Sequence, residues 1–188
     1  MTKSSQGRVL CLACLCIVLA LAACGSTAED HFRQGNEFSQ SGDFDKAVEE
    51  YQRALELEPE NVDAMSNLGV AYYNLEQLDE AIEQYSKALE LAPRDADIHS
   101  NLAAAHVQKY QQSGAPAQLE SALEEYTEAV ELEPNLAEAH FGLGVVYLLL
   151  QRNDEAILAF ARFQELDTGK DPTATENAAE YLKQLRGQ

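Results

Sequence analysis

The chain has 188 residues, enough for one domain of ordinary size, and 46% of them are hydrophobic while 24% are charged. The 13 Lys and Arg residues are far outnumbered by 32 Asp and Glu residues, which gives a formal net charge of −19. Because a polyanion is repelled by nucleic acid and gains nothing from an anionic lipid surface, this composition argues against nucleic-acid binding.

The first 23 residues have the layout of a secretory leader. A short basic region with Lys3 and Arg8 precedes an apolar run over 9–23, which is too short for a comfortable membrane span. The run ends in the tetrapeptide Leu-Ala-Ala-Cys at 21–24. This ending resembles the lipobox of bacterial lipoproteins. The resemblance implies a cleaved signal peptide over 1–23 and lipidation of Cys24.

All four cysteines lie in this N-terminal stretch, and residues 25–188 contain none. Cys11, Cys14 and Cys16 belong to the apolar run, where cysteine serves as a small hydrophobic residue. We therefore expect no disulfide and no cysteine metal site in the mature chain. The alternative for Cys24 is a small residue at the end of an uncleaved signal anchor.

A lipidated Cys24 would hold the chain on a membrane, since each buried methylene contributes about 0.8 kcal/mol. Residues 24–27 would then form a tether of only ~15 Å, because the helical pattern begins near Ala28. Loss of the leader removes two positive charges and brings the net charge from −19 to −21. The resemblance implies the bacterial cell envelope as location. Gly25, in place of the Asp that retains many lipoproteins in the inner membrane, favours the outer membrane in a cell that has one.

A repeated pattern fills the remainder of the chain. The segment Ala47–Pro59 is matched by Ala81–Pro93 at an offset of 34 residues, and by Ala122–Pro134 at a further 41. Apolar residues at helical spacing predict two amphipathic helices in each copy, and the proline ends the second. Small residues that let the helices approach closely recur in the first helix, at Gly35, Gly69, Ala103 and Gly144.

This period, with small, aromatic, small and proline positions in order, resembles the tetratricopeptide repeat. The resemblance implies an all-α solenoid over 28–170 with four helix-turn-helix repeats at 28–61, 62–95, 96–136 and 137–170. Residues 171–188 are expected to form a capping helix and a tail. The cap should use one apolar face, made of Ala174, Ala178, Tyr181, Leu182 and Leu185.

Two departures from the repeat are visible. The third repeat has seven extra residues, which we place at Tyr110–Pro116 because 113–116 reads Ser-Gly-Ala-Pro, a loop signal. We expect them to lengthen the turn between the two helices. The fourth repeat has Phe163 in place of a small residue and Thr168 in place of proline, so we expect it to be distorted near its end.

The residues that could serve in catalysis or in metal or cofactor binding are better explained by helix packing. Three of the four histidines share one position of the repeat, the fourth takes an aromatic position, and packing accounts for all of them: His31, His99, His140 and His106. Residues 142–144, Gly-Leu-Gly, follow no predicted strand and lack the third glycine of a dinucleotide loop. We therefore predict no enzyme activity, no cofactor and no metal. An enzyme that uses the histidines is the least favoured hypothesis.

In this family the first helices of successive repeats line a concave groove that accepts an extended peptide or a helix. The resemblance implies a groove formed by Phe32, Asn36, Asp63, Ser66, Val70, Tyr73, Asn74, Asp97, Ser100, Val107, Gln108, Glu138, Phe141, Val145, Leu148 and Leu149. One acid recurs at the same edge of every repeat, and the floor becomes more apolar toward the fourth. Two structural roles remain open: the acids can complement helix N-termini, and residues 145–150 can pack on the cap.

The groove is expected to bind a basic or apolar segment of a protein partner. Asn36, Asn67 and Asn101 resemble asparagines of chaperone-tail binders, but Phe32 and Asp97 replace two of the basic residues that hold an acidic tail. We therefore predict a membrane-anchored scaffold for protein–protein interaction in the envelope. The alternative is a binder of a glycan or peptidoglycan fragment, for which a chain without Trp offers few aromatic platforms.

Overall fold

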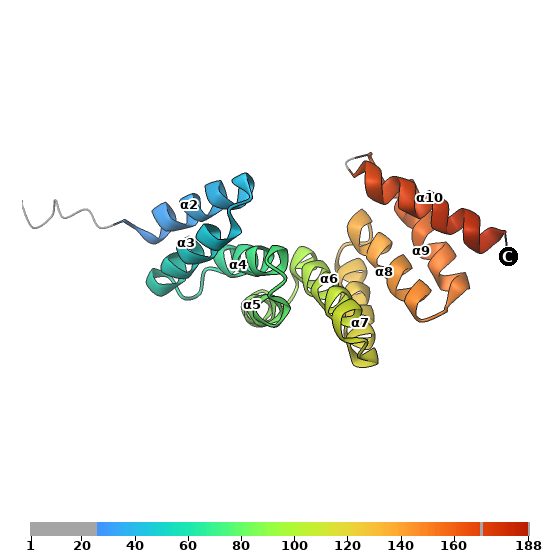
Figure 1. The fold of residues 1–188 in the computed structure, drawn as a ribbon, viewed down its shortest axis with the longest axis horizontal. Coiled ribbons are helices and arrows are strands. Elements are labelled where there is room, and N and C mark those ends of the chain that lie inside the picture. The colour runs from blue at the N-terminus through green and yellow to red at the C-terminus, as the bar shows by residue number, and fades with distance from the viewer. Residues whose placement is uncertain (1–25, 170, 188) are drawn as a thin grey trace, which may run out of the picture.

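The computed structural model describes residues 26–169 and 171–187, and over these ranges the chain forms nine helices and no strand. The helices are α2 (Ala28–Ser41), α3 (Phe44–Leu57), α4 (Val62–Asn74), α5 (Leu78–Leu91), α6 (Ala96–Ser113), α7 (Pro116–Leu132), α8 (Ala137–Leu149), α9 (Asn153–Leu166) and α10 (Pro172–Arg186). Successive helices pair, and each pair packs on the next. The result is an arc with α2 and α10 at its ends (Figure 1), which confirms the predicted solenoid with a terminal cap.

In the first three repeats the first helix begins where a local side chain accepts from its free backbone N–H groups, whereas α8 has Leu136 at this position and no side-chain cap. Thr27 and Asp30 form a reciprocal capping box at the start of α2. Asn61 accepts a hydrogen bond from the Ala64 N–H at 2.9 Å, and Asp95 accepts one from Ile98 at 3.1 Å. The starts of α2, α4, α6 and α8 thus lie at 28, 62, 96 and 137.

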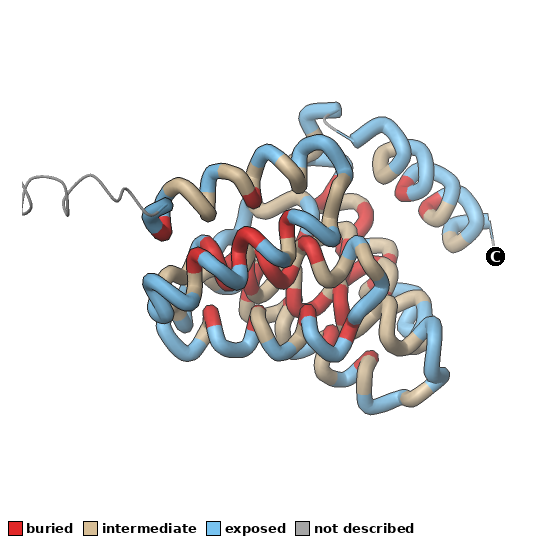
Figure 2. The backbone as a smooth tube through the Cα atoms, turned by 60° about the vertical axis from the view of Figure 1, so that its left-hand side comes forward, coloured by how far each residue is buried: buried red, intermediate tan, exposed pale blue. Residues whose placement is uncertain are grey.

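Aromatic rings from the second helices fill the core by lying directly on glycines of the first helices. A Cβ on Gly35 would lie 2.6 Å from the Tyr51 ring, and one on Gly69 would lie 2.6 Å from Tyr85. Buried residues accordingly follow the sides of the helices that face their neighbours (Figure 2). In the first, second and fourth repeats a glycine beneath the aromatic ring therefore keeps the helix pair close.

The third repeat breaks this pattern because Ala103 occupies the glycine position. The ring of Tyr126 instead lies on Gly142 in the next repeat, where a Cβ would come within 2.1 Å of the Tyr126 Cζ atom. Asn67 and Asn101 stand at the position of Gly142 in the two preceding repeats. Tyr126 therefore joins two repeats, a role that the sequence analysis did not predict.

The expectation for the Tyr110–Pro116 insertion was wrong. The extra residues lengthen the two helices, since α6 has 18 residues against 13 in α4, and α7 has 17 against 14 in α5. Only Gly114 and Ala115 lie between α6 and α7, and Gly114 takes the left-handed φ of 67° that ends the helix. A helical extension satisfies its backbone groups internally, whereas a longer turn would leave them to solvent.

The fourth repeat is less distorted than its sequence suggested. Helix α9 has 14 residues, as α3 and α5 do, and Phe163 is buried within it with its ring 5.2 Å from that of Phe141. The irregularity begins after the helix, where Asp167 is more extended (ψ 125°) than its counterpart Glu58 (ψ 82°). This link delivers the chain to α10, whose predicted apolar face packs on α8 and α9.

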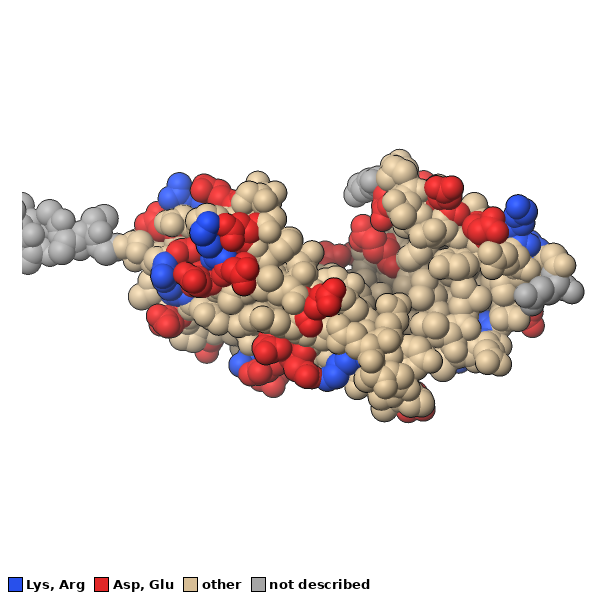
Figure 3. Space-filling model, viewed as in Figure 1, with Lys and Arg blue, Asp and Glu red and all other residues tan. Residues whose placement is uncertain are grey.

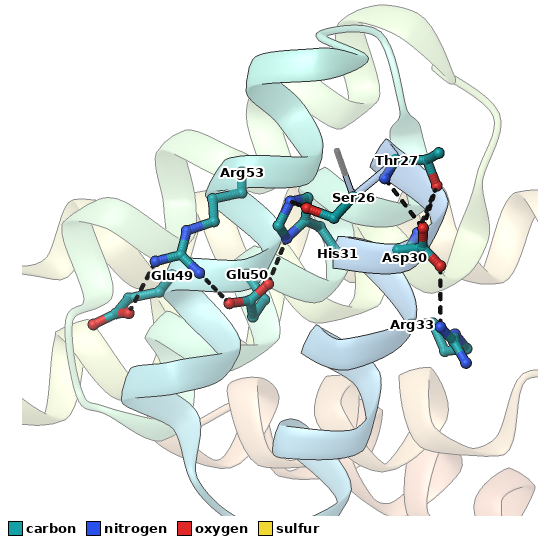
Figure 4. Close-up of polar contacts among 8 residues, drawn as sticks. All are labelled: Ser26, Thr27, Asp30, His31, Arg33, Glu49, Glu50 and Arg53. Carbon is teal, nitrogen blue, oxygen red and sulfur yellow. Dashed lines mark hydrogen bonds and ion pairs between the residues drawn. The ribbon is translucent and has the colours of Figure 1, made fainter. Parts of the chain in front are cut away.

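Three of the four histidines make polar contacts between the two helices of their own repeat, and the fourth contacts a loop. His31 Nδ1 lies 2.6 Å from Glu50 Oε2, and Arg53 also contacts this buried carboxylate (Figure 4). His99 and Glu125 repeat the contact at 2.6 Å in the third repeat. His106 Nδ1 lies 2.8 Å from the Gln118 side-chain oxygen, and His140 Nε2 lies 3.0 Å from a backbone oxygen. These contacts link helices and loops of the scaffold.

Candidate partner-binding groove

A cavity of about 1060 Å³, here called the acidic cavity, opens on the concave side of the arc. It lies among the N-terminal ends of α4, α6 and α8 and the link from α9 to α10. Its described lining contains no Lys or Arg but seven carboxylates: Asp63, Asp95, Asp97, Glu133, Glu138, Asp167 and Asp171. Figure 3 shows acidic side chains beside the hollow between the N-terminal helices and α10. A surface of one sign attracts ligands of the opposite charge.

Five of the seven carboxylates of this cavity fall into two groups. The side chains of Asp95 and Asp171 cap α6 and α10, so helix formation explains them. Asp63, Asp97 and Glu138 lie exposed in the first turns of α4, α6 and α8, and none forms an ion pair with a described residue. Negative charges in a first turn interact favourably with the positive end of the helix dipole, and these three also face the solvent of the cavity.

A second cavity of about 490 Å³, here called the aromatic cavity, adjoins the first. Its lining comes from the later turns of α4 and α6 together with α7 and α8: Tyr73, Asn74, Glu76, Ala104, Val107, Gln108, Gln111, Tyr126, Phe141, Gly142 and Val145. Tyr73, Ala104, Tyr126 and Phe141 line both cavities. The two cavities therefore form one continuous groove, acidic at one end and aromatic at the other.

The tyrosines of the groove are neutral hydrogen-bonding groups at physiological pH. Burial raises the pKa of Tyr126 well above its usual value, and the nearby Tyr73 raises it further. Burial also raises the pKa of Tyr73. Both hydroxyls therefore keep their protons, and the rings keep the electron-rich faces that favour cations.

A smaller pocket of about 170 Å³ lies between the first two repeats, and most residues that line it have polar side chains. The Tyr51 hydroxyl donates to Asn36 Oδ1 at 2.7 Å, and Asn67 Nδ2 donates to the same oxygen at 2.9 Å. These bonds fix the orientation of both amides along the concave side. Asn101, the next in this series, lines the acidic cavity.

The predicted groove residues separate into those that line a cavity and those that do not. Thirteen of the sixteen line one of the three cavities: Asn36, Asp63, Ser66, Val70, Tyr73, Asn74, Asp97, Ser100, Val107, Gln108, Glu138, Phe141 and Val145. Phe32 packs against Tyr51 at a ring separation of 6.0 Å, and Leu148 packs in the cluster that holds the cap. Leu149 is partly exposed outside these cavities. Packing in the cluster formed with α9 and α10 thus accounts for part of the apolar end of α8.

Tyr126, Gly142 and Gln111 line the groove without having been predicted. Tyr126 comes from a second helix, and Gln111 from the helical extension. The glycine that admits Tyr126 was considered only as a part of a dinucleotide loop. An alignment of the repeats could have indicated the place of Tyr126, because Gly142 replaces the asparagine found at this position in the two preceding repeats.

Two further findings concern only the described residues. No group of three or more His, Cys, Asp and Glu side chains there is arranged to hold a metal ion. None of the helices there combines the length and the apolar character needed to cross a membrane. Cys24, the predicted lipidation site, lies outside the described residues.

The repeat pattern and the fold agree with family models. Models described as tetratricopeptide repeats match residues 32–96 and 137–169, and a third, described as a TPR repeat, matches 118–151. Together these matches span more than half of the chain. The chain belongs to the tetratricopeptide repeat family. No curated protein matches its sequence.

Solved tetratricopeptide-repeat structures share the architecture. The thermophilic TPR protein TTC0263 of Thermus thermophilus is similar with a TM-score of 0.74 and 24% identity, over 85% of this chain and 83% of that one. YrrB, described as a TPR protein with an unusual peptide-binding site, has a TM-score of 0.64 and 27% identity, over 86% and 79%. The first TPR domain of Spaghetti (RPAP3), bound to the HSP90 peptide SRMEEVD, has a TM-score of 0.61 and 26% identity, over 66% and 94%.

Proposed function

We propose that this chain is a membrane-anchored scaffold of the bacterial cell envelope that binds a basic segment of a partner protein in its groove. The observation that carries the proposal is the acidic cavity, whose described lining holds seven carboxylates and no Lys or Arg. Similar repeat structures support a peptide as ligand, since one is bound to an HSP90 peptide and another has a peptide-binding site.

The negative charge of the groove favours a positively charged ligand. The peptide SRMEEVD bound by the similar domain carries three acidic residues near its end. Here Asp97 faces the cavity and Phe32 packs on Tyr51, so an acidic tail would meet repulsion at the centre of the groove. A basic segment would gain in association rate and lose affinity as salt screens the charges.

Charge reversal at Asp63, Asp97 and Glu138 tests this proposal. We expect Lys at these three positions to weaken capture of envelope partners at least tenfold, because it replaces attraction by repulsion along one wall. Capture from envelope extract by the triple variant, quantified by mass spectrometry at two salt concentrations, measures this loss.

A matched control is available on the second helices. Lys at Glu56, Glu90 and Glu131 changes the net charge by the same amount at three exposed, equivalent positions of α3, α5 and α7 that line neither cavity. Partners that depend on the groove should be captured by this control and lost by the groove variant. Equal capture by both variants would show that the acids of the groove have only a structural role.

The anchor rests on the lipobox-like ending of the leader. Helix α2 begins at Ala28, four residues after Cys24, so an acylated Cys24 would hold the first repeat against the bilayer. We expect Cys24→Ala to leave an uncleaved precursor without lipid, detected by mass spectrometry and by membrane fractionation. A Cys24→Ala chain that is still processed and acylated would contradict the proposed anchor.

A further inference from the structure

The aromatic cavity owes its shape to features found only at the junction of the third and fourth repeats. The lengthened α6 supplies Gln111, which has no counterpart in the shorter α4. Gly142 admits the ring of Tyr126 where the two preceding repeats have asparagines. Phe141 likewise stands where the two preceding repeats have Ser66 and Ser100, so two polar positions of the earlier repeats are apolar in the wall of this cavity.

One polar atom of this cavity lacks a partner. The side-chain oxygen of Gln108 is buried, and among the described residues it is the single buried side-chain nitrogen or oxygen without a hydrogen bond. A buried acceptor left in this way costs about 1–3 kcal/mol. The Gln108 side chain itself lines the cavity. A ligand that brings an N–H or O–H donor there would recover that cost once the amide turns its oxygen toward the ligand. Glu76 adds a carboxylate to the lining.

We propose that the aromatic cavity binds an arginine side chain of the basic partner segment, an inference that rests on the proposed function of the groove. The guanidinium group is planar, stacks on aromatic faces, and carries N–H donors in a fixed fork. Tyr73 and Phe141 are the partly exposed aromatic residues of the lining on which the guanidinium would stack, and Gln108 would supply the acceptor. The adjoining acidic cavity receives the neighbouring basic residues of the same segment.

Other side chains fit the cavity less well. A lysine ammonium is more strongly hydrated and cannot stack through a planar group. A leucine would leave the Gln108 oxygen unpaired, and a tyrosine would satisfy that oxygen but gain nothing from the surrounding negative charge. Arginine combines a donor, a planar face and a positive charge.

A peptide series isolates this contribution. The probe is the acetylated, amidated peptide Ala-Lys-Ala-Xaa-Ala-Lys with Xaa as Arg, citrulline, Lys, Tyr or Leu, titrated into the full lipidated chain in detergent micelles and followed by ligand-observed NMR. The two lysines are constant, so differences in Kd report on Xaa alone. We expect the Arg peptide to bind at least fivefold more tightly than the other four.

Variants at Gln108 connect the preference to the cavity. Gln108→Leu should abolish the advantage of Arg over Lys, whereas Gln108→Glu, which keeps the shape and adds charge, should increase it. Gln112→Leu, an exposed position on the same helix outside the cavity, should leave it unchanged. The Glu variant also keeps the test decisive where the Leu variant fails to fold.

Each alternative result has a defined meaning. Equal binding of all five peptides, tighter binding of the Tyr or Leu peptide, a preference for Arg that survives Gln108→Leu, or one that does not rise in Gln108→Glu would overturn the arginine site. If partner capture still depends on Asp63, Asp97 and Glu138 in that case, the proposed function stands and this inference alone fails. Loss of the dependence on those acids would instead reject the proposed function.

Discussion

Phe160→Ala should destabilise the C-terminal half of the solenoid by about 3–5 kcal/mol, the cost of removing a fully buried aromatic ring. Phe160 lies on Gly144, where a Cβ would come within 2.5 Å of its ring, and its exposed fraction is 0%. Its ring centroid lies 5.7 Å from that of Phe141 and 5.1 Å from that of Tyr181 on the cap. The substitution therefore removes contacts of α9 with both α8 and α10.

Because neighbouring repeats stabilise one another in a solenoid, the loss should be largest near the mutation. Urea unfolding of the full chain gives the change in free energy, and amide hydrogen exchange locates it. We expect faster exchange in α8, α9 and α10 and little change in α2 and α3. Leu158→Ala on the same helix is the control, since Leu158 is 70% exposed and its truncation should cost less than about 0.5 kcal/mol. Equal losses from the two variants would contradict this account of the cap.

Gly142→Ala should destabilise the chain by about 1–3 kcal/mol and weaken peptide binding. The new Cβ would lie 2.1 Å from the Tyr126 Cζ atom, so the ring must leave its place between the third and fourth repeats. The direction of the stability change shows whether residue 142 is closely packed. In an open helix the same substitution stabilises by about 0.5–1 kcal/mol, because alanine loses less backbone freedom on folding than glycine does.

A compensating substitution tests the cause. Ala103→Gly restores the glycine that lies beneath the ring in the first, second and fourth repeats, and should give Tyr126 an alternative place within its own repeat. We therefore expect Ala103→Gly to recover part of the stability lost in Gly142→Ala, as a non-additive term in a double-mutant cycle of urea unfolding. If the free-energy changes of the two substitutions are additive, the Tyr126 ring does not move from residue 142 to residue 103.

The regular part of the fold could be predicted from sequence because the signals for each repeat lie within a short stretch of the chain. Ala47–Pro59 and its copies carry the apolar spacing, the small positions and the helix-ending proline within a short stretch. The predicted cap is likewise a single amphipathic segment. Such features depend on contacts between residues close in sequence, and the structure confirms the solenoid that they predict.

The irregular part was not predictable in this way. The turn signal at 113–116 marks where the chain reverses, since Gly114 ends α6 and Pro116 begins α7, but it does not reveal how far the flanking helices extend. The place of Tyr126 depends on a glycine in the following repeat. Helix α8 is apolar on most of its surface, so its sequence does not show that Phe141 and Val145 line a cavity while Leu148 packs only in the cluster of α8, α9 and α10.

The measurement that tests the central claim most directly is site-specific crosslinking in the cell from which the chain comes. A photoreactive phenylalanine analogue at Tyr73, which lines both cavities, reports what occupies the groove, and the same analogue at exposed Leu158 serves as control. We predict that position 73, and not 158, crosslinks to a protein segment that contains arginine flanked by further basic residues. A glycan adduct, an acidic segment, or the same adducts at both positions would contradict the account.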